Sequence, residues 1–147
     1  MLVETLKSLF TRDLNKLKLE IESYTDESKI WAIDKNILNS AGNLCLHLVG
    51  NINTYIGAEI GKTGYIRNRE LEFSLKDIPR AELIEKIENT IVVVNNALDS
   101  LTETDLQAIY PQIVFEKEMT TEFFLVHLSV HLGYHLGQIN YHRRMIV

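Results

Sequence analysis

Apolar residues recur at intervals of three and four along four long stretches of the chain, which is the pattern of amphipathic helices. The stretches cover about residues 2–24, 35–60, 80–101 and 120–144. Helices of roughly 20 to 25 residues are about 30 Å or more long, and helices of matched length favour lateral packing. The pattern therefore predicts an all-α fold, a four-helix bundle.

Capping residues and prolines indicate where the helices begin and end. Asp34 is a candidate N-cap of the second helix, Pro79 suits the first turn of the third, and Thr120 or Thr121 suits the N-cap of the fourth. Two connections are long. Residues 61–78 join the second helix to the third, and residues 102–119 join the third to the fourth. Residues 110–115 are a candidate extended segment, whereas the β-branched run 91–94 is expected to be helical because the longer period outweighs it.

Composition and charge fit one domain over residues 1–147. The net charge of −5 argues against nucleic-acid binding, because such proteins concentrate Lys and Arg. The single cysteine, Cys45, gives no sign of an oxidising compartment and is expected to be a small buried residue. We see neither a signal-peptide pattern nor about 18 consecutive apolar residues, so we expect a cytoplasmic protein with no membrane partner.

Histidines carry the candidate chemistry. His127, His131 and His135 follow one another at steps of four on the fourth predicted helix. Each step rises about 6 Å, so neighbours in the run can aim at one point while His127 and His135 are about 12 Å apart. His47, expected on the inner face of the second helix, is the natural third ligand. Three imidazoles suit Zn, Ni, Cu or Fe(II) and leave a position open for water or substrate.

Other interpretations of the histidines stay open at this point. A histidine among apolar neighbours is more often a hydrogen-bonded core residue than a ligand, and three histidines at steps of four also suit a solvated or proton-sensing face. His142, between Tyr141 and Arg143, is expected at the surface.

Three segments carry a resemblance to a known superfamily. Residues 131–139, HLGYHLGQI, resemble the helix-four motif of the DinB-like superfamily, a His-xxx-His pair followed by x-Gly-Gln-Ile. Residues 43–51, with His47 before a Gly-Asn pair, resemble its helix-two motif. Residues 67–73, RNRELEF, resemble a stretch of a DinB-related group of unknown function. The resemblance spans nearly the whole chain and implies a four-helix bundle of the DinB/YfiT-like kind.

The resemblance also implies a metal site and a reaction class. It assigns one divalent ion, Zn or Ni in our expectation, to His47, His131 and His135, and it suggests a homodimer. His127 is not among the three ligands and is expected as a candidate neighbour of the site or of its substrate. The superfamily includes S-transferases that use low-molecular-weight thiols, and a related maleylpyruvate isomerase. We therefore expect a metal-dependent enzyme acting on a small molecule, first a thiol-dependent S-transferase for small electrophiles. The alternatives are a non-catalytic, stress-associated protein with a structural or regulatory metal, and a metal-dependent hydrolase.

Several further residues are candidates for the surroundings of the ion. Gln138 is as well suited to hold a ligand imidazole as to form a plain structural bond. Arg67 and Arg69 are expected to form ion pairs or to be solvated, ahead of gripping a substrate carboxylate. Tyr134 is placed to reach the open end of the site, although a tyrosine at helical spacing more often serves packing.

Two glycines and two glutamates are the last candidate residues around the predicted metal site. Gly137 is expected to permit close helix–helix approach, and Gly133 to leave room near the metal. Glu118 and Glu122 are candidate general bases only by default.

Overall fold

The structure is a computed structural model that describes residues 1–146. These residues form six α-helices, one 3₁₀-helix and one π-helix, and no strand occurs among them. In chain order the elements are α1 (Leu2–Glu22), the 3₁₀-helix η1 (Glu27–Trp31), α2 (Ala41–Ile52), the π-helix η2 (Asn53–Ala58), α3 (Arg69–Ser74), α4 (Arg80–Asp99), α5 (Glu103–Gln107) and α6 (Thr121–Met145). The all-α prediction is confirmed.

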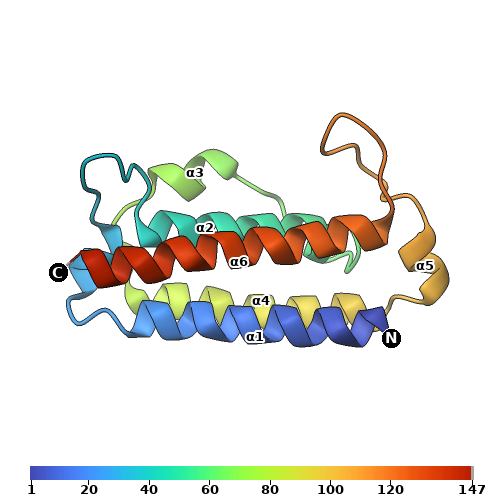
Figure 1. The fold of residues 1–147 in the computed structure, drawn as a ribbon, viewed down its shortest axis with the longest axis horizontal. Helices are drawn as coiled ribbons and strands as arrows, with labels where there is room; N and C mark the ends of the chain where they lie inside the picture. Colours follow the sequence, from blue (N-terminus) through green and yellow to red (C-terminus); the bar gives the residue numbers. More distant parts are fainter. Residues whose placement is uncertain (147) are drawn as a thin grey trace.

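The four long helices α1, α2, α4 and α6 pack side by side as a bundle (Figure 1). Helix α1 packs against α4 and α6, and α2 packs against the same two helices. Fully buried apolar side chains from all four helices fill the space between them: Phe10, Leu14, Leu48, Ile52, Leu83, Ile87, Leu125 and Ile139. Short helix α3 and the connection before α6 lie on the outer side of α2 and α6 (Figure 1).

Helix α2 begins at Ala41, so the predicted start near residue 35 is wrong. Ser40 is the N-cap, and its hydroxyl accepts a hydrogen bond of 3.1 Å from the Asn43 backbone N–H. Asp34, the predicted cap, instead pairs with Ile37 in an isolated bridge. Lys35 has a φ of 46°, which a right-handed helix does not accommodate.

The other predicted helices agree better with the structure. Thr120 caps α6 by accepting a hydrogen bond of 3.1 Å from the Phe123 N–H, Pro79 precedes α4, and residues 91–94 are helical. The two long connections each contain a short helix, α3 and α5, that the hydrophobic pattern did not predict. Residues 110–115 form no strand, although neighbouring Ile109 pairs with Thr120.

His142 is buried, so its predicted surface position is wrong. It lies three residues after buried Ile139 and so shares the inner face of α6. Its Nδ1 is 2.6 Å from the Tyr24 hydroxyl and its Nε2 is 2.8 Å from the Ala32 carbonyl oxygen. The hydroxyl donates to Nδ1 and Nε2–H donates to the carbonyl, which ties the end of α6 to the segment after α1.

Among residues 1–146, no helix is both long enough and apolar enough to cross a membrane.

Candidate metal centre

Helices α2 and α6 bring together the three histidines that the sequence singled out. One ring nitrogen each from His47, His131 and His135 lies within 4.8 Å of the others. The Nε2 atoms of His47 and His131 are 3.3 Å apart. Two imidazole nitrogens bound to one tetrahedral ion at about 2.0–2.1 Å are about 3.4 Å from each other. The spacing therefore fits a single ion between the helices.

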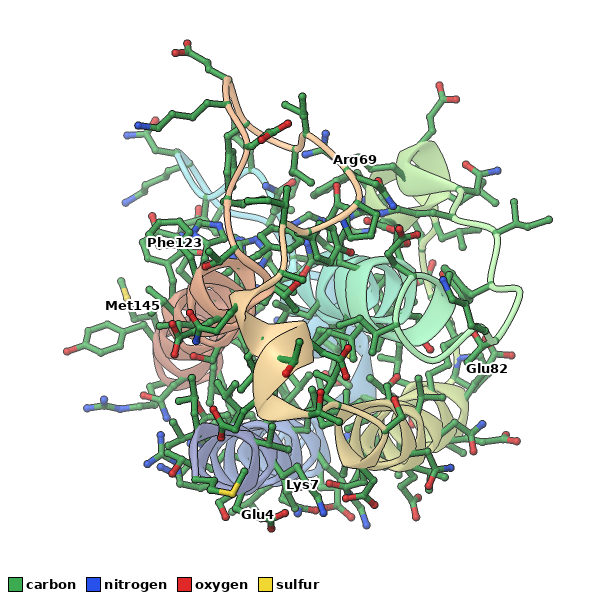
Figure 2. All side chains as sticks on the ribbon, turned by 90° about the vertical axis from the view of Figure 1, so that its right-hand side faces the viewer. Glu4, Lys7, Arg69, Glu82, Phe123 and Met145 are labelled. Atoms are coloured by element: carbon green, nitrogen blue, oxygen red, sulfur yellow. The ribbon has the colours of Figure 1, made fainter. Side chains whose placement is uncertain are left out.

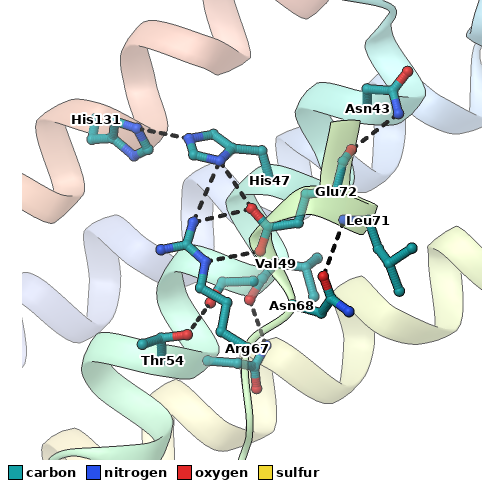
Figure 3. A network of polar contacts seen from close by, with 11 residues as sticks. Asn43, His47, Val49, Thr54, Arg67, Asn68, Leu71, Glu72 and His131 are labelled. Atoms are coloured by element: carbon teal, nitrogen blue, oxygen red, sulfur yellow. Dashed lines mark hydrogen bonds and ion pairs between the residues drawn. The ribbon is translucent and has the colours of Figure 1, made fainter. Parts of the chain in front are cut away.

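A buried carboxylate sets the orientation of His47. Oε1 of Glu72, which is only 5% exposed, lies 3.1 Å from Nδ1 of His47 (Figure 3). Nη2 of Arg67, a donor, also lies 3.4 Å from this nitrogen, but it donates to Oε1 of Glu72 over a shorter distance of 3.0 Å. The closer carboxylate, which only accepts, therefore favours the tautomer with the proton on Nδ1, and the lone pair of Nε2 then faces His131. Glu72 thus selects the tautomer that a metal ligand requires.

Arg67 in turn holds Glu72. Its Nε lies 2.8 Å from Oε2 of Glu72 and its Nη2 lies 3.0 Å from Oε1, a two-pronged ion pair (Figure 3). Burial raises the pKa of Glu72, but the hydrogen bonds from His47 and Arg67 outweigh it and lower the pKa below its usual range. Glu72 is therefore a carboxylate at neutral pH. The expected ion pair of Arg67 is present, and it reaches the edge of the histidine cluster.

The helix-two segment provides the space and the contacts that hold α3 in place. A Cβ added at Gly50 would lie 1.9 Å from Oε2 of Glu72, so only glycine leaves room for this carboxylate. The Asn43 side-chain amide donates to the backbone oxygens of Glu72, at 3.0 Å, and Leu75, at 2.8 Å. Asn68 caps α3 through the Leu71 N–H. Residues of α2 on both sides of His47 therefore position Glu72.

His135 is oriented by a second partner, Gln138. Oε1 of Gln138 lies 2.7 Å from Nδ1 of His135, one turn along α6. When this amide oxygen accepts the Nδ1 proton, Nε2 of His135 keeps its lone pair, as Nε2 of His47 does. Of the two roles predicted for Gln138, the structure supports contact with the imidazole.

The protein environment favours neutral imidazoles. Burial, followed by the nearby imidazoles of His135 and His47, lowers the pKa of His131 to about 4. Burial also lowers the pKa of His135, against the opposing hydrogen bond from Gln138. Because neutral imidazole is the form that binds metals, these shifts favour ligation near pH 7. The other ring nitrogen of His131, Nδ1, is buried and has no hydrogen-bond partner among residues 1–146.

The remaining histidine and tyrosine candidates lie at the margin of the cluster. His127 is not part of it, and its ring packs against Phe115 and Phe124, with ring centroids 4.8 and 6.1 Å away. The Tyr134 ring lies 5.2 Å from that of His135 and is largely exposed.

The charged candidates other than Arg67 lie farther away. Arg69 is exposed on α3 (Figure 2). Glu118 is exposed, and Glu122 precedes His131 by nine residues, about 13 Å along the helix. Neither glutamate borders the cluster.

Gly133 and Gly137 do not have the roles that we predicted. A Cβ at Gly137 would meet no atom within 4 Å, so no neighbouring helix approaches closely there. A Cβ at Gly133 would have only Oδ2 of Asp13, on α1, as a neighbour at 3.9 Å. Two residues rotate a helix by about 200°, which places Gly133 on the side of α6 away from His131 and His135.

Sequence reasoning missed Glu72 as the partner of His47. Glu72 stands in the Arg67–Phe73 segment that resembles the DinB-related group, but one sequence does not reveal which carboxylate of a long connection folds back onto α2. The glycine at position 50, three residues after His47, was the available signal.

The comparisons with known proteins agree with the extent of this fold. A family model with the description "Protein of unknown function (DUF1572)" matches residues 2–147. A search of curated proteins finds no match.

Proposed function

The chain belongs to the DUF1572 family of proteins of unknown function, and we propose that it is a metal-dependent enzyme in which His47, His131 and His135 hold one divalent ion. We also place it in the DinB-like superfamily, on the motifs around His47, around His131 and His135, and at residues 67–73. Zn and Ni are the ions that we favour, because both suit imidazole nitrogen.

The pairing of Glu72 with His47 and of Gln138 with His135 is the observation that carries the proposal. Both partners occupy Nδ1, so two Nε2 lone pairs point into one small volume beside His131. A proton on Nε2 of His131 would bridge only the 3.3 Å contact with His47, whereas a cation within the cluster could be bound by all three histidines. Histidines that served only packing would not need two acceptors, Glu72 and Gln138, that orient both Nε2 lone pairs toward the same point.

The reaction that we favour is S-transfer. When bound, the ion would lower the pKa of a thiol and hold it beside the substrate. The thiol loses its proton to solvent, its sulfur forms a bond to an electrophilic carbon of a small molecule, and any leaving group departs with the bonding electron pair. Glu72 holds the Nδ1 proton of His47 throughout, and Arg67 keeps Glu72 ionised.

A thiol needs less help than water to become a nucleophile. A free thiol, with a pKa of about 8.5, is already partly ionised near neutral pH, whereas water reaches a pKa of about 7 only when it is bound to the ion. The carboxylate in contact with the cluster, Glu72, is engaged by both His47 and Arg67, so it is poorly placed to remove a proton from water. Hydrolysis is therefore the second candidate reaction.

Metal analysis of the purified protein tests the site. Protein without a polyhistidine tag is loaded with Zn²⁺ or Ni²⁺, dialysed and measured by elemental analysis beside His131→Ala and His127→Ala. We expect about one ion per chain in the wild type and in His127→Ala, and loss of the ion in His131→Ala. His127 is a matched control because it lies one turn away on the same helix and outside the cluster. Wild-type protein that cannot be loaded would overturn the proposal.

Activity of the loaded protein separates a catalytic from a structural ion. We expect the loaded wild type to couple a low-molecular-weight thiol to a small electrophile, and His131→Ala to lose this activity. A protein that binds the ion and becomes more stable, yet accelerates neither thiol transfer nor hydrolysis, would favour the structural role instead.

A further inference from the structure

A cavity of about 550 Å³ lies between the segment before α2 and the C-terminal half of α6. His135 and Gln138 form part of its wall, so it borders the three-histidine cluster. Its volume lies within the range of small-molecule sites, about 300–1,000 Å³. We propose that this cavity binds an uncharged, mainly apolar small molecule and holds it beside His135. Binding in the cavity is independent of the proposed function, whereas its relation to an ion rests on that function.

The wall of the cavity carries no formally charged residue. Lys, Arg, Asp and Glu make up 24% of the chain, so about three would be expected by chance among the eleven lining residues, yet none is present. Two other cavities of similar size differ in this respect. One of about 560 Å³ includes Asp26 and Lys29, and one of about 530 Å³ includes Arg12 and Lys16. Because an ionised group loses solvation on burial without a partner, this cavity favours an uncharged ligand.

Several large apolar side chains around the cavity are exposed to solvent. Leu38 is 77% exposed, and Tyr134, Tyr141 and Met145 are also largely exposed. Met145 projects outward from α6 (Figure 2). Buried Leu44 completes the apolar wall, one turn before His47 on α2. Large apolar side chains gathered at the mouth of one cavity are typical of a binding site, because a ligand that covers them removes apolar surface from water.

Amide groups supply the polar contacts that the cavity offers. Asn36, Asn39 and Gln138 line it, and primary amides both donate and accept hydrogen bonds. His142 also lines it, but both of its ring nitrogens are engaged, by Tyr24 and by the Ala32 carbonyl. The ligand class that fits is therefore an apolar or aromatic body with a carbonyl, amide or hydroxyl group.

Two fluorescent probes that differ in one charged group test the cavity. N-phenyl-1-naphthylamine is uncharged, and 8-anilino-1-naphthalenesulfonate adds a sulfonate to the same scaffold. We expect the uncharged probe to bind at least ten-fold more tightly, and Leu38→Glu to weaken its binding by at least ten-fold. Val92→Glu is the matched control, since Val92 is 58% exposed on α4 and lies outside the cavity. Equal affinity for the two probes, or equal effects of the two variants, would overturn the proposal.

A comparison of two ions tests whether the cavity borders the centre. Paramagnetic Ni²⁺ quenches a fluorophore at short range and Zn²⁺ does not, so we expect the bound uncharged probe to be dimmer on Ni²⁺-loaded protein. Undiminished fluorescence on fully Ni²⁺-loaded protein would show that the ligand does not lie beside His135. Elemental analysis of the same samples keeps the two proposals apart. Protein that binds the probe but no ion would overturn the metal centre and leave the cavity in place.

Discussion

His47 and Arg67 share one carboxylate, and its two oxygens are both needed. Oε1 of Glu72 accepts from Nδ1 of His47 and from Nη2 of Arg67, while Oε2 accepts from Nε of Arg67. A carboxylate behind a ligand imidazole fixes the ring and raises its basicity. In the proposed metal centre, Glu72 would therefore position His47 rather than react.

Replacing Glu72 by glutamine tests this positioning role. Glutamine keeps the shape of the side chain but offers one acceptor oxygen and two N–H donors. Either Arg67 or His47 then faces a donor instead of an acceptor. We expect Glu72→Gln to weaken Zn²⁺ or Ni²⁺ binding by about 10- to 100-fold, as measured by competition with a chelator.

Glu70→Gln is the control for this variant. Glu70 belongs to the same short helix and is exposed, so the substitution removes an equal charge without touching His47. Equal metal affinities for Glu72→Gln, Glu70→Gln and the wild type would contradict the role assigned to Glu72.

The sequence predicted individual site residues where a local period or a motif marked them. His131 and His135 follow from a step of four on one helix, and His47 follows from its place on an apolar face together with the resemblance. Glu72 was not predicted as their neighbour, because 25 residues and a long connection separate it from His47. His142 was misplaced because its polar neighbours outweighed its spacing from Ile139.

Whole elements were predictable in proportion to their length. Helices α1, α4 and α6 contain enough turns for a hydrophobic period to emerge, and their limits agree closely with the prediction. Helices α3 and α5 have six and five residues, too few for a period, and depend on caps by Asn68 and Thr102. The observed start of α2 differs from the predicted one because the Ser40 cap, and not the apolar pattern, determines where the helix begins.

Packing of α3 on α2 depends on the absence of a side chain at Gly50, whereas Gly137 on α6 has free space around it. In Gly50→Ala the new methyl group would collide with Glu72, so α3 must shift. Overpacking of this kind costs about 1–3 kcal/mol of unfolding free energy, and we expect metal affinity to fall with it. In Gly137→Ala the methyl group meets nothing, so helix propensity alone should raise stability by about 1 kcal/mol.

Urea unfolding of metal-free protein measures both changes in stability, and chelator competition measures metal affinity. A lower unfolding free energy and weaker metal binding in Gly50→Ala, together with a higher unfolding free energy and unchanged metal binding in Gly137→Ala, would support the packing of α3 against α2. Two variants that behave alike would show that α3 does not depend on the space at Gly50.

The proposed ion would connect parts of the molecule that lie far apart in the chain. His47 and His131 are 84 residues apart, and they belong to two neighbouring helices of the bundle (Figure 1). The unfolded chain does not hold three imidazoles together, so the ion binds the folded state preferentially. Binding of this kind stabilises the whole fold by mass action, by about 2.7 kcal/mol at a free-ion concentration 100 times Kd.

Cys45 offers a reporter of this stabilisation. Its side chain is fully buried in α2, so a thiol reagent reaches it only when the fold opens. If opening is global, an ion at 100 times Kd slows labelling of Cys45 by about 100-fold in the wild type. We expect the same slowing in His127→Ala and none in His131→Ala, with labelling followed by mass spectrometry in native buffer. If the ion slows labelling by much less than the factor that its gain in unfolding free energy predicts, α2 opens locally while α6 stays folded. A labelling rate that does not change with the ion would contradict a site shared between the two helices.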